Sequence, residues 1–494
     1  MALNRRDFIK SAVVLSTVTL PSTSFASSQK GTSMSLDNLH LLTATEMSQK
    51  IRSKEVTSEQ LVLACLAQIE LHNPKLNAVF QVQKEQALEQ ARAADAAFKQ
   101  GKILGPLHGV PYALKDLFEA KGVITTAGSN MFKNNLPTED ATIVTRLKKA
   151  GAILIGKSNT PELALSDECN SPVYGRTNNP YDVTRTPGGS SGGAAAAIAA
   201  RMIPFDVGSD IGGSVRIPAH FCGICALKPT HGRIPTTGHI PSYGDAFSQF
   251  NHVGPMARSV DDLELLLNVL AGPDWQDPLA YDAPLSKSDT VNVADLRVGF
   301  YTDDGLVKVP AIFKQAVDTA VDAAKQAGCA TSHQLPEQVQ FGGEILVEHF
   351  LYDGSHHLRE FVNKHGKDLM GEELAGWLSL GTDATIEDAQ RTNARLAELR
   401  NSMIKVFEHA DVLIAPVAPV VAFKHGSADG TADSSMMQAY NLTGWPVATI
   451  PVMLSEEGMP IGIQIIGRPW KDQEVLAIAK AIESRLPELP MPTL

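Results

Sequence analysis

Apolar residues recur at helical spacing in several stretches of the chain. The clearest stretch follows Thr57-Ser58-Glu59-Gln60, a capping box that opens a run with apolar positions at Leu61, Cys65 and Ile69. A second stretch is rich in alanine, covers residues 83–100 and is stopped by Gly101. The same period predicts further helices over residues 142–150, 194–201, 259–270 and 312–327.

Short apolar runs between these helices predict buried strands. The runs cover residues 152–155, 297–301 and 411–416. Because helices and strands alternate along the chain, we expect an α/β fold in which helices cover both faces of a mixed sheet. The sequence contains no internal repeat and no low-complexity segment.

The composition narrows the classes of partner. The chain has 494 residues, enough for one large core or two modest domains, and a formal net charge of −11. This charge, without basic clusters, argues against nucleic acid or an anionic membrane surface as a partner. Five scattered cysteines form no disulfide framework. The histidines His349, His356 and His357 lack other ligands at zinc spacing, so no metal is predicted.

The N-terminus has the pattern of a twin-arginine export signal. Arg5-Arg6 precede Phe8-Ile9-Lys10, a modest apolar run covers residues 12–20, and Ser24-Phe25-Ala26 offers a small-x-small cleavage site. No lipid-accepting cysteine follows the run, and no other segment approaches the length of an apolar membrane span.

These features predict three parts of the chain. We expect a signal peptide over residues 1–26, a polar linker over 27–36 and a folded domain over 37–494. The mature protein is therefore expected to be bacterial, soluble and periplasmic or secreted, with no membrane anchor. The sequence does not define an oligomeric state.

Two Gly-Gly-Ser turns carry the candidate chemistry. The first, residues 188–193, contains Ser190, the second contains Ser214, and Lys115 lies upstream of both. A serine hydroxyl is a poor nucleophile until a base takes its proton, and a lysine can be that base when burial lowers its pKa. Lys115 follows the apolar run 110–114, which predicts a buried setting. Backbone N–H groups of residues 210–214 could hold an oxyanion, because the glycines there allow unusual backbone conformations.

Two other patterns compete with this interpretation. Residues 188–192 also match Gly-x-Ser-x-Gly, the nucleophile elbow, but the preceding residues 181–187 are polar and contain a proline. Residues 151–158 match the phosphate-loop pattern, yet the four middle residues are Ala-Ile-Leu-Ile. Such a run favours a buried strand, which we expect Gly156 and Lys157 to close near the site. Nucleotide binding is therefore not expected.

Taken together and in order, the motifs resemble those of the amidase signature family. The shared segments are Lys115-Asp116 and residues 188–193, 210–216, 221–223, 227–230, 254–258 and 460–467. The resemblance implies one α/β domain with about eleven strands in its mixed sheet and an enzyme that needs no metal or organic cofactor. It also implies a signature core over about residues 90–270 and a variable cap over about 288–411.

The resemblance further implies roles for individual residues. Ser214 would attack the carbonyl, Ser190 would relay protons from a cis peptide setting, and neutral Lys115 would be the base. The oxyanion would be held by the N–H groups of Ile211, Gly212, Gly213 and Ser214. Supporting residues would be Asp116, Ser191, Asp210 and Arg216. The implied reaction converts a linear, small-molecule amide into a carboxylate plus ammonia or an amine through an acyl-enzyme.

Substrate choice is expected to depend on loops around these motifs. Candidate wall segments cover residues 128–132, 167–173, 243–250 and 350–357. Their aromatic residues predict an apolar or aryl substrate group. The candidate pocket residues are Met131, Phe132, Cys169 and Tyr352.

Two alternative functions use the same scaffold. The first is an esterase with the same three residues, because esters are easier to cleave than amides. The second is a non-catalytic periplasmic binding protein, against which the intact Lys115, Ser190 and Ser214 argue. The export signal argues against a tRNA amidotransferase role, which the resemblance places in the cytoplasm with partner subunits.

Overall fold

A mixed sheet of eight strands forms the centre of the computed structural model, which describes residues 36–241, 248–381, 383–427 and 435–494. The strand order is β10-β9-β11-β13-β12-β7-β8-β6. The strands β9, β10 and β11 pair in parallel, and the other neighbours pair antiparallel. Their bounds are β6 (Phe205–Asp210), β7 (Cys225–Lys228), β8 (His252–Ala257), β9 (Arg297–Phe300), β10 (Ala330–His333), β11 (Val412–Pro416), β12 (Val447–Leu454) and β13 (Pro460–Gly467).

A second sheet of three strands continues this layer beyond β6. Its order is β1 (Val79–Phe80), β3 (Ile153–Ser158) and β2 (Pro111–Lys115), and β2 lies beside β6. The expected sheet of about eleven strands is therefore divided into eight and three within the described residues. At the division, the backbone N–H of Lys115 donates to the side chain of Asp206 on β6 instead of to a backbone carbonyl. A short ribbon of β4 (Asn170–Ser171) and β5 (Gly175–Arg176) stands apart.

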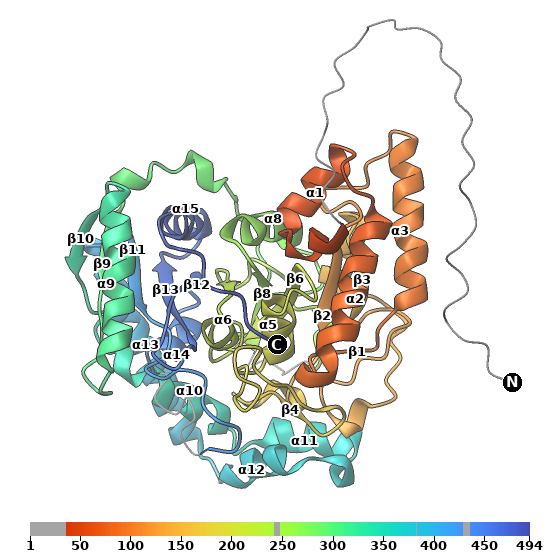
Figure 1. The fold of residues 1–494 in the computed structure, drawn as a ribbon. Helices are drawn as coiled ribbons and strands as arrows, with labels where there is room; N and C mark the ends of the chain where they lie inside the picture. Colours follow the sequence, from red (N-terminus) through yellow and green to blue (C-terminus); the bar gives the residue numbers. More distant parts are fainter. Residues whose placement is uncertain (1–35, 242–247, 382, 428–434) are drawn as a thin grey trace, which may run out of the picture. The chain divides into compact units, whose positions relative to one another are not determined.

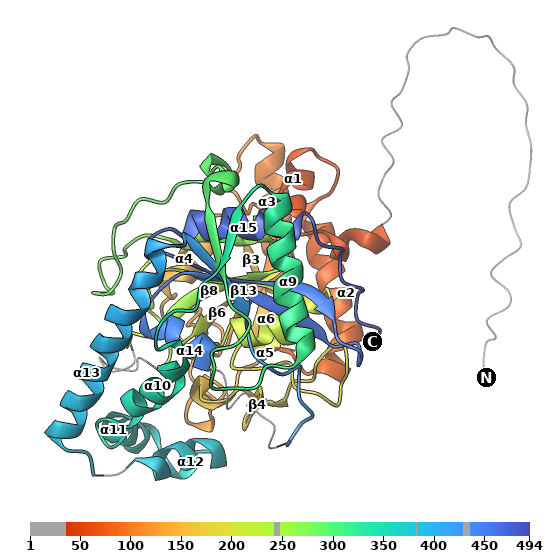
Figure 2. The ribbon, with the colours of Figure 1, turned by 90° about the vertical axis from the view of Figure 1, so that its left-hand side faces the viewer.

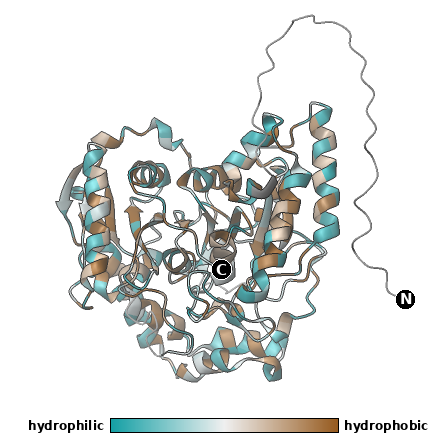
Figure 3. Ribbon diagram, in the orientation of Figure 1, coloured by the Kyte–Doolittle hydropathy of each residue, from teal (hydrophilic) through white to brown (hydrophobic). Residues whose placement is uncertain are grey.

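Helices cover both faces of the sheet, which confirms the predicted α/β class. Figure 1 shows α8 and α15 on one side of the strands and α5 and α6 on the other. Figure 3 shows hydrophilic and hydrophobic residues together on outer helices such as α9. The helices are α1 (Ala44–Arg52), α2 (Ser58–Leu76), α3 (Lys84–Lys99), α4 (Thr142–Lys149), α5 (Gly192–Ala199), α6 (Arg216–Cys222), α8 (Val260–Leu270), α9 (Ala311–Gln326), α10 (Gly342–Leu351), α11 (His356–His365), α12 (Glu372–Leu380), α13 (Ile386–Met403), α14 (Ser435–Leu442) and α15 (Asp472–Glu483).

The elements predicted from periodicity are found with shifts of a few residues at their ends. The capping box is present, because the side chain of Thr57 accepts the N–H of Gln60 at 3.2 Å and the Gln60 side chain accepts the N–H of Thr57 at 2.8 Å. Residues 151–158 follow α4 and contain the fully buried strand β3, as expected for a run that does not bind phosphate. The strand prediction is therefore confirmed.

The segment predicted as a cap has two structural parts. Its strands β9 and β10 belong to the central sheet and its helix α9 packs on that sheet, whereas α10 to α13 gather at one side (Figure 2). Two of these helices bury Val362 and Leu374 against Leu117 and Leu163 of the region with the signature motifs. The α11 and α12 part of the cap is thus attached through a small apolar cluster, whereas α10 and α13 pack into the main core.

The predicted signal peptide, residues 1–26, and nearly all of the linker, residues 27–36, lie outside the described residues, so both stay predictions. Residues Ser35–Leu494 form one compact unit. Within the part of the chain that the structure describes, no helix is long and apolar enough to cross a membrane.

Candidate active site

Lys115 is the buried centre of the site. It ends β2, has no exposed surface, and its Nζ donates to Ser190 Oγ at 2.7 Å and to Ser191 Oγ at 2.8 Å. Longer contacts reach the hydroxyl of Ser209 at 3.3 Å and its carbonyl oxygen at 3.4 Å. The structure therefore brings the predicted lysine and the first predicted serine together, although 75 residues separate them in the chain.

The first serine turn leads directly into α5. The Gly189–Ser190 peptide bond is cis, as the resemblance implies, and Ser191 occupies the N-cap position of α5. An N-cap serine normally accepts a backbone N–H of its helix, but the hydroxyl of Ser191 accepts from Lys115 instead. Glycine is required at 189, because a Cβ there would lie 2.3 Å from the carbonyl oxygen of Ser166.

The second serine turn connects β6 to α6 around the carboxylate of Asp210. Its oxygens accept the N–H groups of Gly213 at 2.8 Å and Val215 at 3.2 Å, and they also pair with Arg216. The carbonyl of Ser214 accepts the N–H of Ser191 at 3.1 Å, so the backbones of the two serine turns are joined. Ser214 remains half-buried, as a nucleophile that must meet a substrate requires.

Two details differ from the expected relay and oxyanion hole. The N–H of Gly213 is already donated to Asp210, so it holds the turn and does not face an oxyanion. The N–H groups of Ile211, Gly212 and Ser214 have no hydrogen-bond acceptor among the described residues. The hydroxyl of Ser214 likewise has no hydrogen bond to that part of the chain, so only the Lys115–Ser190 half of the relay is formed.

The electrostatics of the site favour a neutral lysine. Burial lowers the pKa of Lys115 to about 7, and the neighbouring groups Cys169, Asp210 and Asp206 oppose that shift. Burial also disfavours the charged form of Asp210, but Arg216 outweighs it and holds the pKa of Asp210 well below its usual range. Asp210 therefore stays ionised in its pair with Arg216, while the pKa of the neighbouring Lys115 lies near neutral pH.

A second buried lysine lies behind the first. Lys157 of β3 has its Nζ 3.5 Å from Asp116 Oδ1, and Asp116 accepts the N–H and the hydroxyl of Thr126. Burial raises the pKa of Asp116, opposed by Lys157, and burial lowers the pKa of Lys157, opposed by Asp116. Asp116 is thus a supporting residue of the Lys115 loop. Lys157 lies near the site at the end of a buried strand, as expected, whereas Asp206 is a buried site residue that the sequence did not single out.

The predicted pocket residues lie in different surroundings. Phe132 packs against the cap, with its ring 5.8 Å from that of Phe361, and Met131 belongs to the same apolar cluster. Cys169 has no exposed surface and lies behind the first serine turn, where its Cβ would be 2.6 Å from a Cβ at Gly192. The contribution of these three residues to a substrate pocket stays a prediction. Tyr352 ends α10, with its ring 5.7 Å from that of His349, and stays a prediction.

The wall next to the second serine turn comes from α10 and α14. A Cβ at Gly212 would lie 3.4 Å from Leu346 Cδ2 and 3.8 Å from Gln438 Nε2. Sequence reasoning missed both residues, because they lie far along the chain and carry no motif. Of the predicted wall segment 243–250, residues Tyr243 and Phe247 lie outside the described residues, and Phe250 is fully buried.

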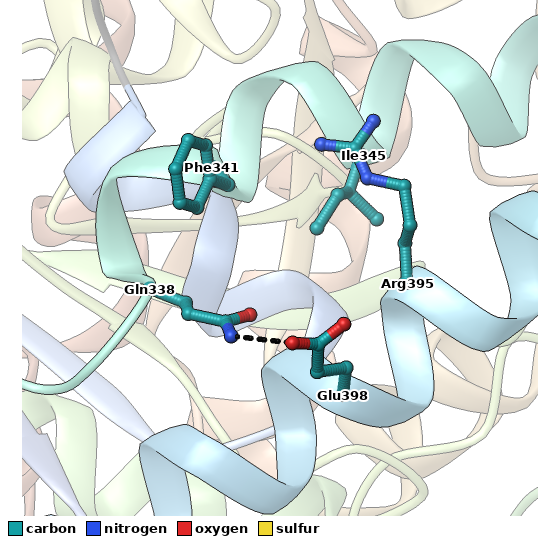
Figure 4. A pocket seen from close by; sticks show the side chains of 5 residues that line it. All are labelled: Gln338, Phe341, Ile345, Arg395 and Glu398. Carbon is teal, nitrogen blue, oxygen red and sulfur yellow. Dashed lines mark hydrogen bonds between the residues drawn. The ribbon is translucent and has the colours of Figure 1, made fainter.

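A separate small cavity lies between α10 and α13 (Figure 4). Its volume is about 150 Å³, and its lining consists of Gln338, Phe341, Ile345, Arg395 and Glu398. Gln338 donates to Glu398 at 3.0 Å, and Arg395 pairs with Glu344 at 3.0 Å. The polar groups of the lining are thus bonded to residues of the same two helices and the turn before α10.

The described residues contain no group of three His, Cys, Asp or Glu side chains that could hold a metal ion. All five cysteines are buried and free: Cys65, Cys169, Cys222, Cys225 and Cys329. The absence of a cofactor stays a prediction.

Comparisons with known proteins agree with the arrangement of the motifs. The family model described as Amidase matches residues 60–476. A glutamyl-tRNA(Gln) amidotransferase subunit from Geotalea daltonii is 35% identical over 475 residues, covering 90% of this chain and 96% of that protein. A fatty acid amide hydrolase structure has a TM-score of 0.83 and 26% identity, with coverage of 92% of this chain and 87% of its own. A bacterial aryl acylamidase of the amidase signature family has a TM-score of 0.81 and 26% identity, with coverage of 90% and 96%.

Proposed function

Since the chain belongs to the Amidase family of enzymes that hydrolyse C–N bonds of amides, we propose that Lys115, Ser190 and Ser214 carry out this reaction through an acyl-enzyme. The observation that carries the proposal is the 2.7 Å hydrogen bond between the buried amine of Lys115 and the hydroxyl of Ser190. A lysine held neutral by burial can take a proton from a serine, whereas a solvated lysine cannot.

Acylation begins with two linked proton transfers. Lys115 takes the proton of Ser190 as Ser190 takes the proton of Ser214, and the Ser214 oxygen forms a bond to the carbonyl carbon of the amide. The hydroxyl of Ser214 must rotate toward Ser190 for this step, since no hydrogen bond joins it to the described residues. The relay then runs backwards, protonates the leaving nitrogen, and the C–N bond breaks to release ammonia or an amine.

The negative charge that forms on the carbonyl oxygen needs hydrogen-bond donors. The N–H groups of Ile211 and Gly212 are unused within the described residues, and the N–H of Gly213 is committed to Asp210. We therefore assign the oxyanion to Ile211 and Gly212, with the N–H of Ser214 beside them. The ion pair of Asp210 and Arg216 keeps this turn in place before the substrate binds.

Water completes the cycle. Lys115, through Ser190, takes a proton from water as the water oxygen attacks the ester carbon on Ser214. The ester C–O bond breaks, Ser214 recovers its proton, and a carboxylic acid leaves. Each proton taken up by Lys115 in one half-reaction is returned in the same half-reaction, so the enzyme ends each cycle in its starting state.

The substrate we propose is a small-molecule linear amide. The net charge of −11 disfavours a nucleic-acid partner, and Leu346 beside Gly212 favours an apolar group next to the carbonyl. The relative from Geotalea daltonii belongs to a tRNA amidotransferase, so glutamine with the transfer partners is the competing substrate class. An ester is a third substrate class for the same three residues.

We also propose that the protein is exported. The twin arginines at 5 and 6 and the Ser24-Phe25-Ala26 site support this proposal. Replacing both arginines by lysine, Arg5→Lys with Arg6→Lys, should leave the full-length chain in the cytoplasm, whereas the unchanged chain should be recovered from the periplasm with Ser27 as its first residue. Recovery of the unchanged chain from the cytoplasm with residues 1–26 intact would contradict it.

The test of the activity is release of the carboxylic acid product by the chain from residue 27 onward, with ammonia measured as well for the amides. Primary aliphatic, aryl and peptidyl amides and glutamine should be compared, each with its matched ester, in wild-type, Lys115→Ala, Ser190→Ala and Ser214→Ala proteins. We expect release from an aliphatic or aryl amide that falls at least about 10³-fold in Lys115→Ala and Ser214→Ala. Release that survives Lys115→Ala would show another base, and activity on esters alone would replace the amidase assignment.

A further inference from the structure

The side chain of Asp206 joins the two sheets at the point where Lys115 ends β2. Its Oδ1 accepts the backbone N–H of Lys115 at 2.9 Å and that of Val207 at 2.7 Å. Asp206 is fully buried on β6, and β2 lies beside β6 although the two strands belong to separate sheets. The carboxylate therefore takes the place of a backbone hydrogen bond between the strands.

The same strand also holds the far end of Lys115. Its Nζ contacts the hydroxyl and the carbonyl oxygen of Ser209, three residues after Asp206. A lysine side chain has four rotatable bonds, so a contact at each end restricts where the amine can lie. A glycine at 208 makes this path possible, because a Cβ there would be 2.6 Å from Ser191 Oγ, which also accepts from Lys115.

We propose that Asp206 is a positioning residue for Lys115, which acts by fixing the backbone of the base and by placing a buried carboxylate beside it. The inference rests on the proposed role of Lys115 as the base. Asp206 lies outside the motifs that identified the site, and its carboxylate forms no hydrogen bond with Ser190 or Ser214 in the structure.

Other ionisable groups face the pair from the neighbouring strands. Lys157 of β3 favours the charged form of Asp206, as does the hydroxyl of Ser158. Cys169 and Asp210 of β6 raise the pKa of Lys115, as Asp206 does. Tyr112 of β2 is also buried. Burial raises the pKa of its hydroxyl, and the charges of Asp140 and Asp206 raise it further. Asp116, at the end of β2, is paired with Lys157.

The negative charge of Asp206 determines the direction in which this residue changes the pKa of Lys115. Burial raises the pKa of Asp206 to about 7, against the lowering effects of Ser158, the two N–H groups and Lys157. Ionised Asp206 raises the pKa of Lys115, because a negative charge stabilises the protonated amine. Removal of that charge must therefore favour neutral Lys115 at a lower pH.

Two substitutions separate the charge from the hydrogen bonds. Asp206→Asn keeps a carbonyl oxygen for the two N–H groups, so we expect a plateau kcat within about threefold of wild type and an acid limb moved to lower pH. Asp206→Ala removes the acceptor as well. We expect the same direction of shift, but a plateau kcat lower by about tenfold or more, with KM changed by less than about twofold.

Asp262 supplies the matched control. It is a buried aspartate of α8 whose carboxylate also accepts two backbone N–H groups, those of Ala44 at 3.0 Å and Thr45 at 2.8 Å. Asp262→Asn should lower thermal stability in the same way as Asp206→Asn without moving the acid limb. The amide identified in the panel above serves as substrate, and thermal unfolding is recorded for each variant.

The outcomes distinguish this inference from the proposed function. Activity that persists in Lys115→Ala overturns the proposed function, whatever Asp206 does. If Lys115→Ala is inactive and the acid limb of Asp206→Asn stays in place or moves to higher pH, the positioning role of Asp206 is overturned alone. If Asp206→Ala does not fold, the position of the acid limb in the pH profile of Asp206→Asn still tests the positioning role of Asp206.

Discussion

Arg216 clamps Asp210 at two points beside the nucleophile turn. Its Nη2 lies 2.9 Å from Oδ1 and its Nε 3.0 Å from Oδ2, and neither side chain has exposed surface. The same carboxylate holds the N–H groups of Gly213 and Val215, which flank Ser214. The ion pair and the position of the nucleophile are therefore one structural unit.

Breaking this pair should reduce both stability and activity. Arg216→Ala leaves a buried carboxylate without its cation, so we expect the free energy of unfolding to fall by about 3–5 kcal/mol and kcat to fall at least about 100-fold. Arg216→Lys keeps the charge but loses the two-point geometry, and it should fall between Arg216→Ala and wild type. Chemical denaturation with parallel kinetics checks both values. Normal turnover in Arg216→Ala would show that the Asp210–Arg216 ion pair is not needed to position Ser214.

The acid limb of the pH profile should report Lys115. Its pKa is lowered by burial to about 7, and the neutral form is the base, so kcat/KM should rise about tenfold per pH unit below pH 7 and level off above it. A profile of ammonia release from about pH 5 to 9 measures this. A rate that is flat or falls across that range would exclude a lysine base.

Gly208 should tolerate no side chain. In Gly208→Ala the new Cβ would lie 2.6 Å from Ser191 Oγ and 2.8 Å from Val215 Cγ1, so either the hydroxyl or the strand must move. We expect kcat to fall at least about tenfold, because a misplaced acceptor displaces Lys115. Gly376→Ala is the matched control, since nothing lies within 4 Å of a Cβ at that position of α12. Equal activity of the two variants would refute the proposed packing.

We expect Gln438 to contact the substrate and Phe132 not to contact it. Gln438 is half-buried beside Gly212, whereas Phe132 packs on the cap. We therefore expect Gln438→Leu to change KM about threefold or more across the amide panel with little change in kcat, and Phe132→Leu to leave KM unchanged. Steady-state kinetics on each amide decides between them. The reverse result would support the sequence-based pocket around Phe132.

Local sequence was enough for most elements and for the polar groups of the site. Capping at Thr57 and the apolar run before Lys115 depend on neighbours in the chain, so the sequence predicted the helix α2 and the buried setting of Lys115, although not the strand β2 itself. The Gly-Gly-Ser motifs located Ser190 and Ser214 because backbone geometry restricts such turns to glycine. The aromatic residues of the loops gave no such constraint, so the pocket around Phe132 and Cys169 stays a prediction.

What the sequence by itself determined is the α/β class, the order of the motifs and the lysine and serines that can react. Only the tertiary structure decided that Asp206 meets Lys115, that Gly213 donates its N–H to Asp210, and that Leu346 and Gln438 border the turn. These contacts join residues from separate strands and helices. Burial and hydrogen-bond partners arise only when those elements pack, so no local pattern encodes them.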